Sequence, residues 1–255
     1  MRSRRLWTSL LGGLVVVSLG GAGAGVASGA SVTAKFQDVA PMRVVNISID
    51  GGGTYAQEIA GRFNWQRVDG VEDELPQREF VTFCIELTQV IHYGGRYTYE
   101  EIDLASGPSP GGWGVGAGMG QDKANLLGEL WAAHYDETAG SRDKSAAFQL
   151  AVWETVYDDG LALDGGSFRV RDAGTSAAPA CVGLAEDWLS SLTGHGARAR
   201  LGALSSPTAQ DQLYLCDSSI IPGPLPAPLP GAAWLGMGLL AGLGAMGAWR
   251  RHQNA

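Results

Sequence analysis

The sequence lacks the excess of basic residues that binding to nucleic acid requires. It carries 18 Lys and Arg residues against 26 Asp and Glu residues, so its formal net charge is −8 at pH 7. The basic residues at the two termini, Arg2, Arg4, Arg5, Arg250 and Arg251, fit a role in membrane topology. A chain with this charge is poorly suited to a phosphate backbone. We therefore expect no nucleic-acid partner.

The N-terminus is typical of an export signal. Three arginines within residues 2–5 precede an apolar run over 10–19, and small residues close the segment. This order indicates a secretory signal peptide over residues 1–30. An uncleaved membrane anchor is the alternative, but the strongly apolar part is short for one. We expect the mature protein to lie outside the cytoplasm.

The C-terminus contains the longest stretch without charge. Residues 231–249 include no Asp, Glu, Lys or Arg, and at about 1.5 Å rise per residue a helix of this length matches the core of a bilayer. The proline-rich residues 219–230 favour an extended spacer before it. The basic tail over 250–255 should remain cytoplasmic. We expect a membrane helix over 231–249 that tethers the exported part of the chain.

This C-terminal pattern resembles the PEP-CTERM class of sorting signals, and most of all its VPLPA variant. The residues that match are Pro228, Leu229 and Pro230 before the apolar helix, and Arg250 and Arg251 after it. The resemblance implies recognition by an exosortase in the inner membrane of Gram-negative bacteria that produce exopolysaccharide. It implies a protein tethered before processing and then placed at the cell surface or secreted. A permanent single-span anchor is the alternative.

Residues 31–218 lack an internal repeat and are long enough for one domain with a hydrophobic core. Strand patterns come first, over 43–50, 54–65, 79–87 and 96–102. Helical periodicity follows over 122–135, 145–158 and 181–192, with Asp122 as a cap of the first helix and a late strand over 211–216. We predict an α+β fold in which a β-rich half, barrel-like or sandwich-like, packs against a small helical cluster.

Two common kinds of site lack support in the sequence. The loop 106–121 has Gly-x-Gly spacing, but no buried strand precedes it and no βαβ unit surrounds it, which argues against phosphate binding. Asp158, Asp159 and Asp164 do not have the spacing of a known calcium loop. We predict no metal, no cofactor and no enzymatic activity.

Cysteine is scarce, with three residues in the chain. Cys181 opens the predicted third helix and Cys216 ends the late strand, so we predict a disulfide between them in the exported protein. Cys84 then remains free within an apolar strand. A hydrolase in which Cys84 is the nucleophile and His92 or His134 the base is a further alternative, but no sequence pattern links either histidine to Cys84.

The segment "AAFQLAVWETVYDD" reads as a buried helix that carries a glutamine, Gln149. Burying a carboxamide without a partner costs roughly 2–7 kcal/mol, so Gln149 must be hydrogen-bonded, open to a pocket or chemically altered. A thioester between Cys84 and Gln149 would remove both polar groups from the core, and Trp153 would form a wall that excludes water. An inert core thiol and a glutamine bonded to backbone groups form the alternative.

Two segments resemble the bacterial thioester domain, the TQxA type of Gram-positive surface adhesins. They are "FCIEL" over 83–87 and "FQLAVWETVYD" over 148–158. The resemblance implies a thioester between Cys84 and Gln149, with Trp153 as its wall, that captures amines on a ligand. Phe148 replaces the usual Thr and Glu86 the usual Asp. These residues predict an exported surface or matrix protein that acts as a covalent adhesin on an amine-bearing protein. The alternative is a structural or binding protein of an exopolysaccharide matrix or biofilm without a thioester.

Overall fold

The computed structural model describes residues 30–69, 77–108, 118–176 and 178–223. The described strands are β1 (Ser31–Ser48), β2 (Ala56–Arg67), β3 (Glu79–Cys84), β4 (Arg96–Asp103), β5 (Arg169–Val170), β6 (Arg198–Ser205) and β7 (Gln212–Ile221). The described helices are α1 (Gln121–His134), α2 (Arg142–Tyr157) and α3 (Ala180–Ser191), with short 3-10 turns η1 (Leu104–Ser106) and η2 (Tyr135–Thr138). The predicted α+β class is confirmed.

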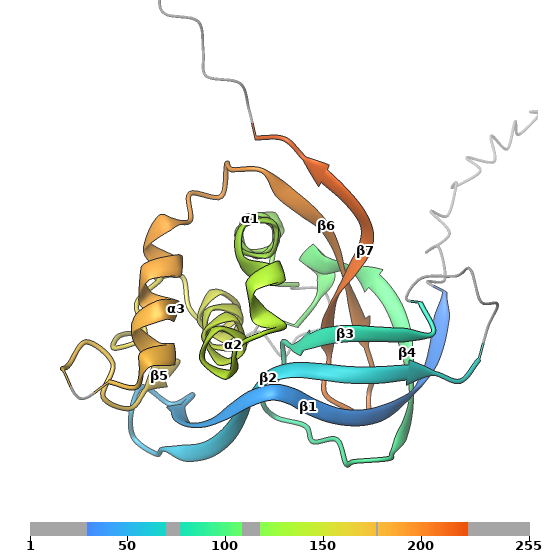
Figure 1. Cartoon of the computed structure of the whole chain (residues 1–255), viewed down its shortest axis with the longest axis horizontal. Helices are drawn as coiled ribbons and strands as arrows, with labels where there is room; N and C mark the ends of the chain where they lie inside the picture. Colours follow the sequence, from blue (N-terminus) through green and yellow to red (C-terminus); the bar gives the residue numbers. More distant parts are fainter. Residues whose placement is uncertain (1–29, 70–76, 109–117, 177, 224–255) are drawn as a thin grey trace, which may run out of the picture.

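The strands form one antiparallel sheet of seven strands in the order β2-β3-β7-β6-β4-β1-β5. Because β1 pairs with β2 as well as with β4, the ring of hydrogen-bonded strands closes on itself. The two-residue strand β5 adds to the far end of β1. Figure 1 shows the three helices gathered on one side of this curved sheet. The helical cluster therefore packs against a barrel-like ring.

Side-chain alternation explains most of the strand positions. The predicted strand 43–50 corresponds to the second half of β1, which begins much earlier, at Ser31. In that first half Val32, Ala34 and Phe36 point into the core, while their neighbours are more exposed. This alternation of buried and more exposed residues is present in the sequence over 31–36. The predicted strand did not include it, and it directly follows the expected signal peptide.

The interior of the barrel is aromatic and contains a satisfied polar chain. Trp65 packs edge-on against Tyr99, with ring centroids 5.6 Å apart. Its indole Nε1 donates to the Thr82 hydroxyl at 2.8 Å, and that hydroxyl donates to Oε1 of Gln212 at 2.7 Å. These bonds join β2, β3 and β7 inside the core, where an unpaired polar atom would be costly.

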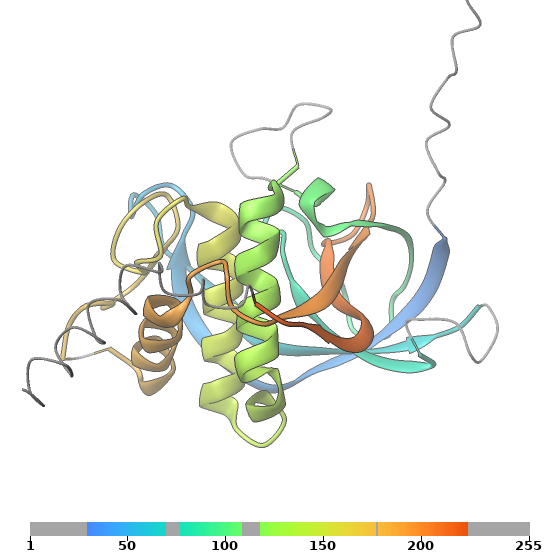
Figure 2. The same ribbon diagram turned by 90° about the horizontal axis from the view of Figure 1, so that it is seen from above.

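Helix α2 is the centre of the helical cluster. Every residue from Ser145 to Tyr157 is buried, as the apolar run predicted. The helix packs on β1, β2 and β3 on one side and on α1 and α3 on others, and Figure 2 shows α1 and α2 side by side. Its N-cap is Ser141, whose hydroxyl accepts from the Lys144 amide at 3.3 Å. Because the sheet and the other helices enclose α2, its residues must be suited to burial on every face and not only along one apolar stripe.

Some predicted boundaries need correction. The cap of α1 is Gly120, with φ of 86° and no side-chain cap, so Asp122 lies in the first turn instead. Strand β6 was not predicted, because its Arg-, Ala- and Gly-rich sequence has weak β propensity. Strand β7 runs to Ile221, so the first residues of the expected spacer 219–230 belong to the sheet.

The predicted terminal segments lie outside the described residues. They are the signal peptide over 1–30 except Ala30, the membrane helix over 231–249, and the sorting residues Pro228, Leu229, Pro230, Arg250 and Arg251. Within the described ranges, no helix combines the length and apolar character needed to cross a membrane.

Candidate functional site

The structure brings Cys84 and Gln149 together. The backbone N–H of Cys84 donates to Gln149 Oε1 at 3.0 Å, and Gln149 Nε2 donates to the Cys84 carbonyl at 2.7 Å. Cys84 is the last residue of β3, and Gln149 lies in the middle of α2. Both residues are 0% exposed. Both hydrogen bonds of the carboxamide therefore go to the backbone of a single strand residue, 65 positions away in sequence.

Gln149 takes the place of a neighbouring strand. The pairing of β3 with β2 ends at Thr82, and its pairing with β7 covers Phe83 and Cys84. On its remaining side, Cys84 presents its N–H and C=O to the Gln149 carboxamide. One amide thus satisfies both backbone groups and finds its own partners there. These bonds answer the energetic question raised by the buried glutamine without requiring a covalent bond.

The thiol of Cys84 is buried and protonated at neutral pH. Burial raises its pKa to about 12, and the nearby Glu86 and Asp211 carboxylates add to this shift. The thiol donates to the Glu86 carbonyl oxygen at 2.8 Å, which opposes the shift. The indole N–H of Trp153 approaches the sulfur closely enough to lower the pKa, but it does not reach a hydrogen bond. The thiol needs a proton acceptor before it can act as a nucleophile.

Unsatisfied polar atoms gather around Cys84. Among the described residues, Glu86 Oε2, the Tyr99 hydroxyl and Trp153 Nε1 are buried side-chain atoms without a hydrogen-bond partner. Glu86 and Trp153 act on the pKa of Cys84, and Cys84 in turn raises the pKa of Tyr99, whose largest shift comes from burial. A native core contains few such atoms, and those present call for an explanation such as chemistry at the site.

The chain after Cys84 is held firmly in place. The backbone N–H of Leu87 donates to the Tyr157 hydroxyl at 2.8 Å, and the Thr88 hydroxyl donates to the Glu86 carboxylate. Asp211 accepts from the Ser206 amide at 2.8 Å, yet its burial raises its pKa to about 6. Two acidic side chains and a strand end are thus fixed around one thiol.

A small hollow of about 140 Å³ leads toward Trp153. Its wall is mainly apolar and is formed by Phe36, Val39, Glu58, Ile59, Phe63, Val90, Ile91, Tyr93, Trp153 and Gln210. Val90 and Tyr93 stand exposed at 67% and 62%. The carboxylate of Glu58 has a raised pKa because it is partly buried in this wall. Trp153 lines this hollow and also acts on the pKa of the buried Cys84 thiol.

Comparison with known proteins does not name the site. No known protein family, curated protein or solved structure matches this chain. The two resemblances therefore rest on their short motifs. The function has to be argued from the Cys84 site.

The predicted disulfide is not formed, which corrects the pairing of Cys181 with Cys216. Both residues are free thiols in the structure. Helix α3 packs on α2 and brings Cys181 near Arg43 and Asp143. Arg43 donates two hydrogen bonds to the Asp143 carboxylate, at 2.9 and 3.1 Å. Strand β7 pairs with β3 and β6 and places Cys216 beside Tyr214. The position of Cys84 within an apolar strand left Cys181 and Cys216 as the expected pair, but α3 packs on α2 while β7 pairs with β3 and β6.

The histidine and calcium alternatives receive no structural support. His134 stacks on Trp188, with ring centroids 4.3 Å apart, and its Nδ1 lies 3.1 Å from Glu137. Asp158 accepts from the backbone amides of two following loop residues at 2.8 Å each. Across the described ranges, no three His, Cys, Asp or Glu side chains are grouped to hold a metal ion.

The sequence did not reveal several members of the site. Tyr99 lies on β4 outside both motif segments, and Tyr157 lies within the segment 148–158 on α2 without a role assigned to it. Asp211 was expected as the first residue of the late strand and directly precedes β7, and Glu86 stood out only as a departure from a motif. Their proximity to Cys84 follows from closure of the barrel and the seating of α2 against it.

Proposed function

We propose that this chain is an exported surface protein whose domain forms an internal thioester between Cys84 and Gln149. The observation that carries the proposal is the registration of the Gln149 carboxamide on the backbone of Cys84 by two hydrogen bonds. A thioester requires the carboxamide carbon to stay beside the cysteine, and this pairing holds it there without freedom to rotate.

The bond-forming step balances in atoms and protons. The Cys84 sulfur attacks the Gln149 carboxamide carbon, the thiol proton moves to the leaving Nε2, and one ammonia departs. The Cys84 N–H already bonded to Oε1 would stabilise the negative charge that develops on this oxygen. Because Cys84 and Gln149 are both shielded from solvent, the bond would resist hydrolysis.

In ligand capture the Cys84 sulfur would be the leaving group, whereas in thioester formation it is the nucleophile. A neutral lysine amine attacks the Gln149 carbonyl carbon, an amide forms, and Cys84 leaves as a thiolate that regains a proton. The hollow lined by Trp153 is the place where we expect the amine to approach. An amine-bearing protein is the partner that this chemistry implies.

The placement of the protein follows from its ends. The signal peptide over 1–30 supports export, and the residues from Pro228 to Arg251 support recognition by an exosortase and a tether in the inner membrane. Processing would then place the domain at the cell surface or in an extracellular matrix. A reporter active only outside the cytoplasm, fused before Pro222, should give signal. Deletion of 222–255 should release the domain from the membrane.

A second candidate is a surface protein that binds without a covalent bond. The satisfied carboxamide of Gln149 and the raised pKa of Cys84 favour it, since both groups are stable as they stand. This candidate would serve as a structural or binding component of an exopolysaccharide matrix.

Intact-mass measurement separates the two candidates. With a thioester, freshly purified protein is lighter than its sequence by one ammonia, and methylamine adds its own mass to that lighter protein by forming an amide at Gln149. Cys84→Ala and Gln149→Ala should each remove the deficit. Cys181→Ala changes another buried free cysteine and should keep it. Full mass together with an alkylatable Cys84 in the unfolded chain would leave the non-covalent candidate.

A further inference from the structure

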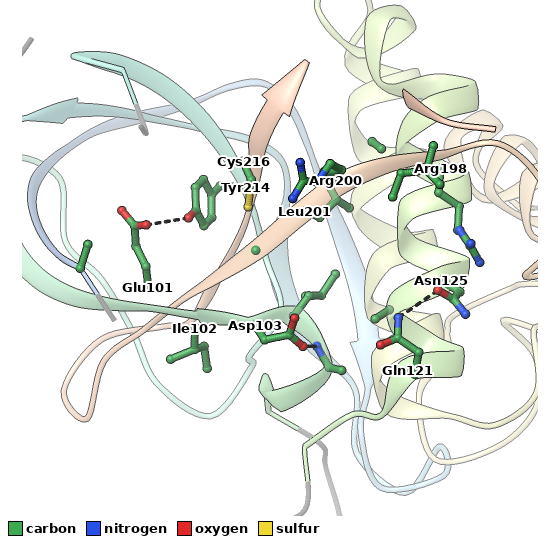
Figure 3. Close-up of a pocket in the computed structure, with 17 residues that line it drawn as sticks. Glu101, Ile102, Asp103, Gln121, Asn125, Arg198, Arg200, Leu201, Tyr214 and Cys216 are labelled. Carbon is green, nitrogen blue, oxygen red and sulfur yellow. Dashed lines mark hydrogen bonds between the residues drawn. The ribbon is translucent and has the colours of Figure 1, made fainter. Parts of the chain in front are cut away.

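A second cavity lies between the barrel and α1 and shares no lining residue with the Cys84 site. It encloses about 570 Å³, within the range of small-molecule sites. Its walls come from β4, η1, β6, β7 and the start of α1 (Figure 3). The Cys84 chemistry leaves this cavity unused.

Strand pairing explains why the cavity exists. Strand β6 pairs with β7 along almost its whole length, but its pairing with β4 covers only Gly202–Ser205. Strand β4 ends at Asp103, where the chain turns into η1. In the described part of the chain, residues 198–201 of β6 therefore have no strand partner on that side. The cavity lies along this unpaired edge of β6, and the start of α1 forms the opposite wall.

The lining side chains carry both charges and two amides. Glu101 and Asp103 come from β4, Arg198 and Arg200 from β6, and Gln121 and Asn125 from α1. Figure 3 shows these groups arranged around the same space. The lining carries two carboxylates and two guanidinium groups, and Arg200 also pairs with Asp217, which lies outside the lining, at 3.0 Å.

Internal bonds fix the directions of these groups. The Tyr214 hydroxyl donates to Glu101 at 3.0 Å. Gln121 Nε2 donates to Asn125 Oδ1 at 3.0 Å. Among the described residues, the second amide atom of each, Gln121 Oε1 and Asn125 Nδ2, has no hydrogen bond and stays available as one acceptor and one donor.

The wall excludes several classes of ligand. An apolar ligand would bury these polar groups without partners, which is unfavourable. An anion would meet Glu101 and Asp103, and a cation would meet Arg198 and Arg200. A neutral ligand rich in hydroxyl groups can donate to the carboxylates and accept from the guanidinium and amide groups. We propose that this cavity binds a neutral oligosaccharide segment, independently of any thioester.

Saturation-transfer and titration NMR on the full chain test this site, in a detergent without a sugar headgroup. The probes are maltotetraose, cellotetraose, mannotetraose and galactotetraose, with tetragalacturonate and an extended peptide as comparators. At least one neutral probe should bind. Gln121→Ala and Asn125→Ala should each raise the Kd for that probe by about two- to tenfold, the effect of losing one neutral hydrogen bond. Gln57→Ala, an exposed glutamine on β2, is the matched control and should bind as the unchanged protein does.

Three results would overturn the proposal. The first is the absence of binding to every neutral probe. The second is equal affinity of the unchanged protein and all three variants for a neutral probe. The third is binding confined to tetragalacturonate or the peptide. Because Gln121 and Asn125 lie on the surface of α1, circular dichroism of the variants verifies that loss of binding is not loss of fold.

Discussion

Gln149 holds the end of β3 from the side, with its carboxamide bonded to both the N–H and the C=O of Cys84. This side chain does for Cys84 what a neighbouring strand does for the rest of β3. It also joins α2 to the barrel at a point where no backbone of α2 could bond, since a helix uses its own backbone groups internally. The fold and the candidate chemistry thus depend on the same carboxamide.

Replacing Gln149 with methionine should strongly destabilise the protein. Gln149→Met keeps most of the side-chain volume but leaves the N–H and C=O of Cys84 buried without partners. We expect a loss of about 2–4 kcal/mol in the free energy of unfolding, measured by urea titration. The exposed Gln57→Met is the control and should change it by less than about 0.5 kcal/mol. Equal small effects would mean that the Gln149 bonds contribute little.

The polar chain inside the barrel should depend on Thr82. Thr82→Val has nearly the same shape, but it leaves Trp65 Nε1 and Gln212 Oε1 without their shared hydroxyl. The expected loss in unfolding free energy is about 2–4 kcal/mol. Thr98→Val removes an exposed hydroxyl bonded to Thr33 at 3.1 Å, and should cost about 0.5 kcal/mol or less. If the two variants unfold at the same urea concentration, the buried chain is not stabilising.

Glu154 should make the protein less stable as pH rises. It is 1% exposed, and burial raises its pKa from 4.5 to about 7, with smaller contributions from Asp158 and Asp164. The folded state therefore binds the proton more tightly than the unfolded state. Its contribution to stability is fully present below about pH 4.5 and is lost as pH rises through about 7.

Glu154→Gln tests this dependence, because it retains an oxygen for the Ala162 amide, which lies 2.9 Å from Glu154 Oε1. Unfolding free energies of both proteins should be compared from pH 4 to pH 8. The variant should lose less stability over that range, by on the order of 2–3 kcal/mol. Parallel curves for the two proteins would show that Glu154 does not titrate between these limits.

Thiol labelling should find three free cysteines and no disulfide. After methylamine treatment and without reductant, the unfolded chain should take up three equivalents of a maleimide. In the folded protein Cys216 should react first, because Cys84 and Cys181 are 0% and 1% exposed while Cys216 is half-buried. Only one reactive thiol in the unfolded chain would restore the pairing of Cys181 with Cys216.

Local patterns in the sequence were sufficient for many elements of the fold. Alternation over 79–87 predicted β3, and the apolar character of "AAFQLAVW" predicted a buried α2. Strand β6 escaped prediction because its small and basic residues gain strand structure only from pairing with β4 and β7. Tertiary pairing, rather than propensity, decides such a segment.

The sequence by itself determined that a buried Gln149 would need a hydrogen-bond partner, since the demand of a polar group in an apolar segment is local. Only the tertiary structure decided which groups bond to its carboxamide. Closure of the barrel sets the end of β3 against α2, so that Gln149 bonds to the backbone of Cys84. The same packing leaves Cys181 and Cys216 as separate thiols and surrounds Cys84 with Glu86, Tyr99 and Trp153. These outcomes depend on contacts between residues far apart in the chain, which no local pattern encodes.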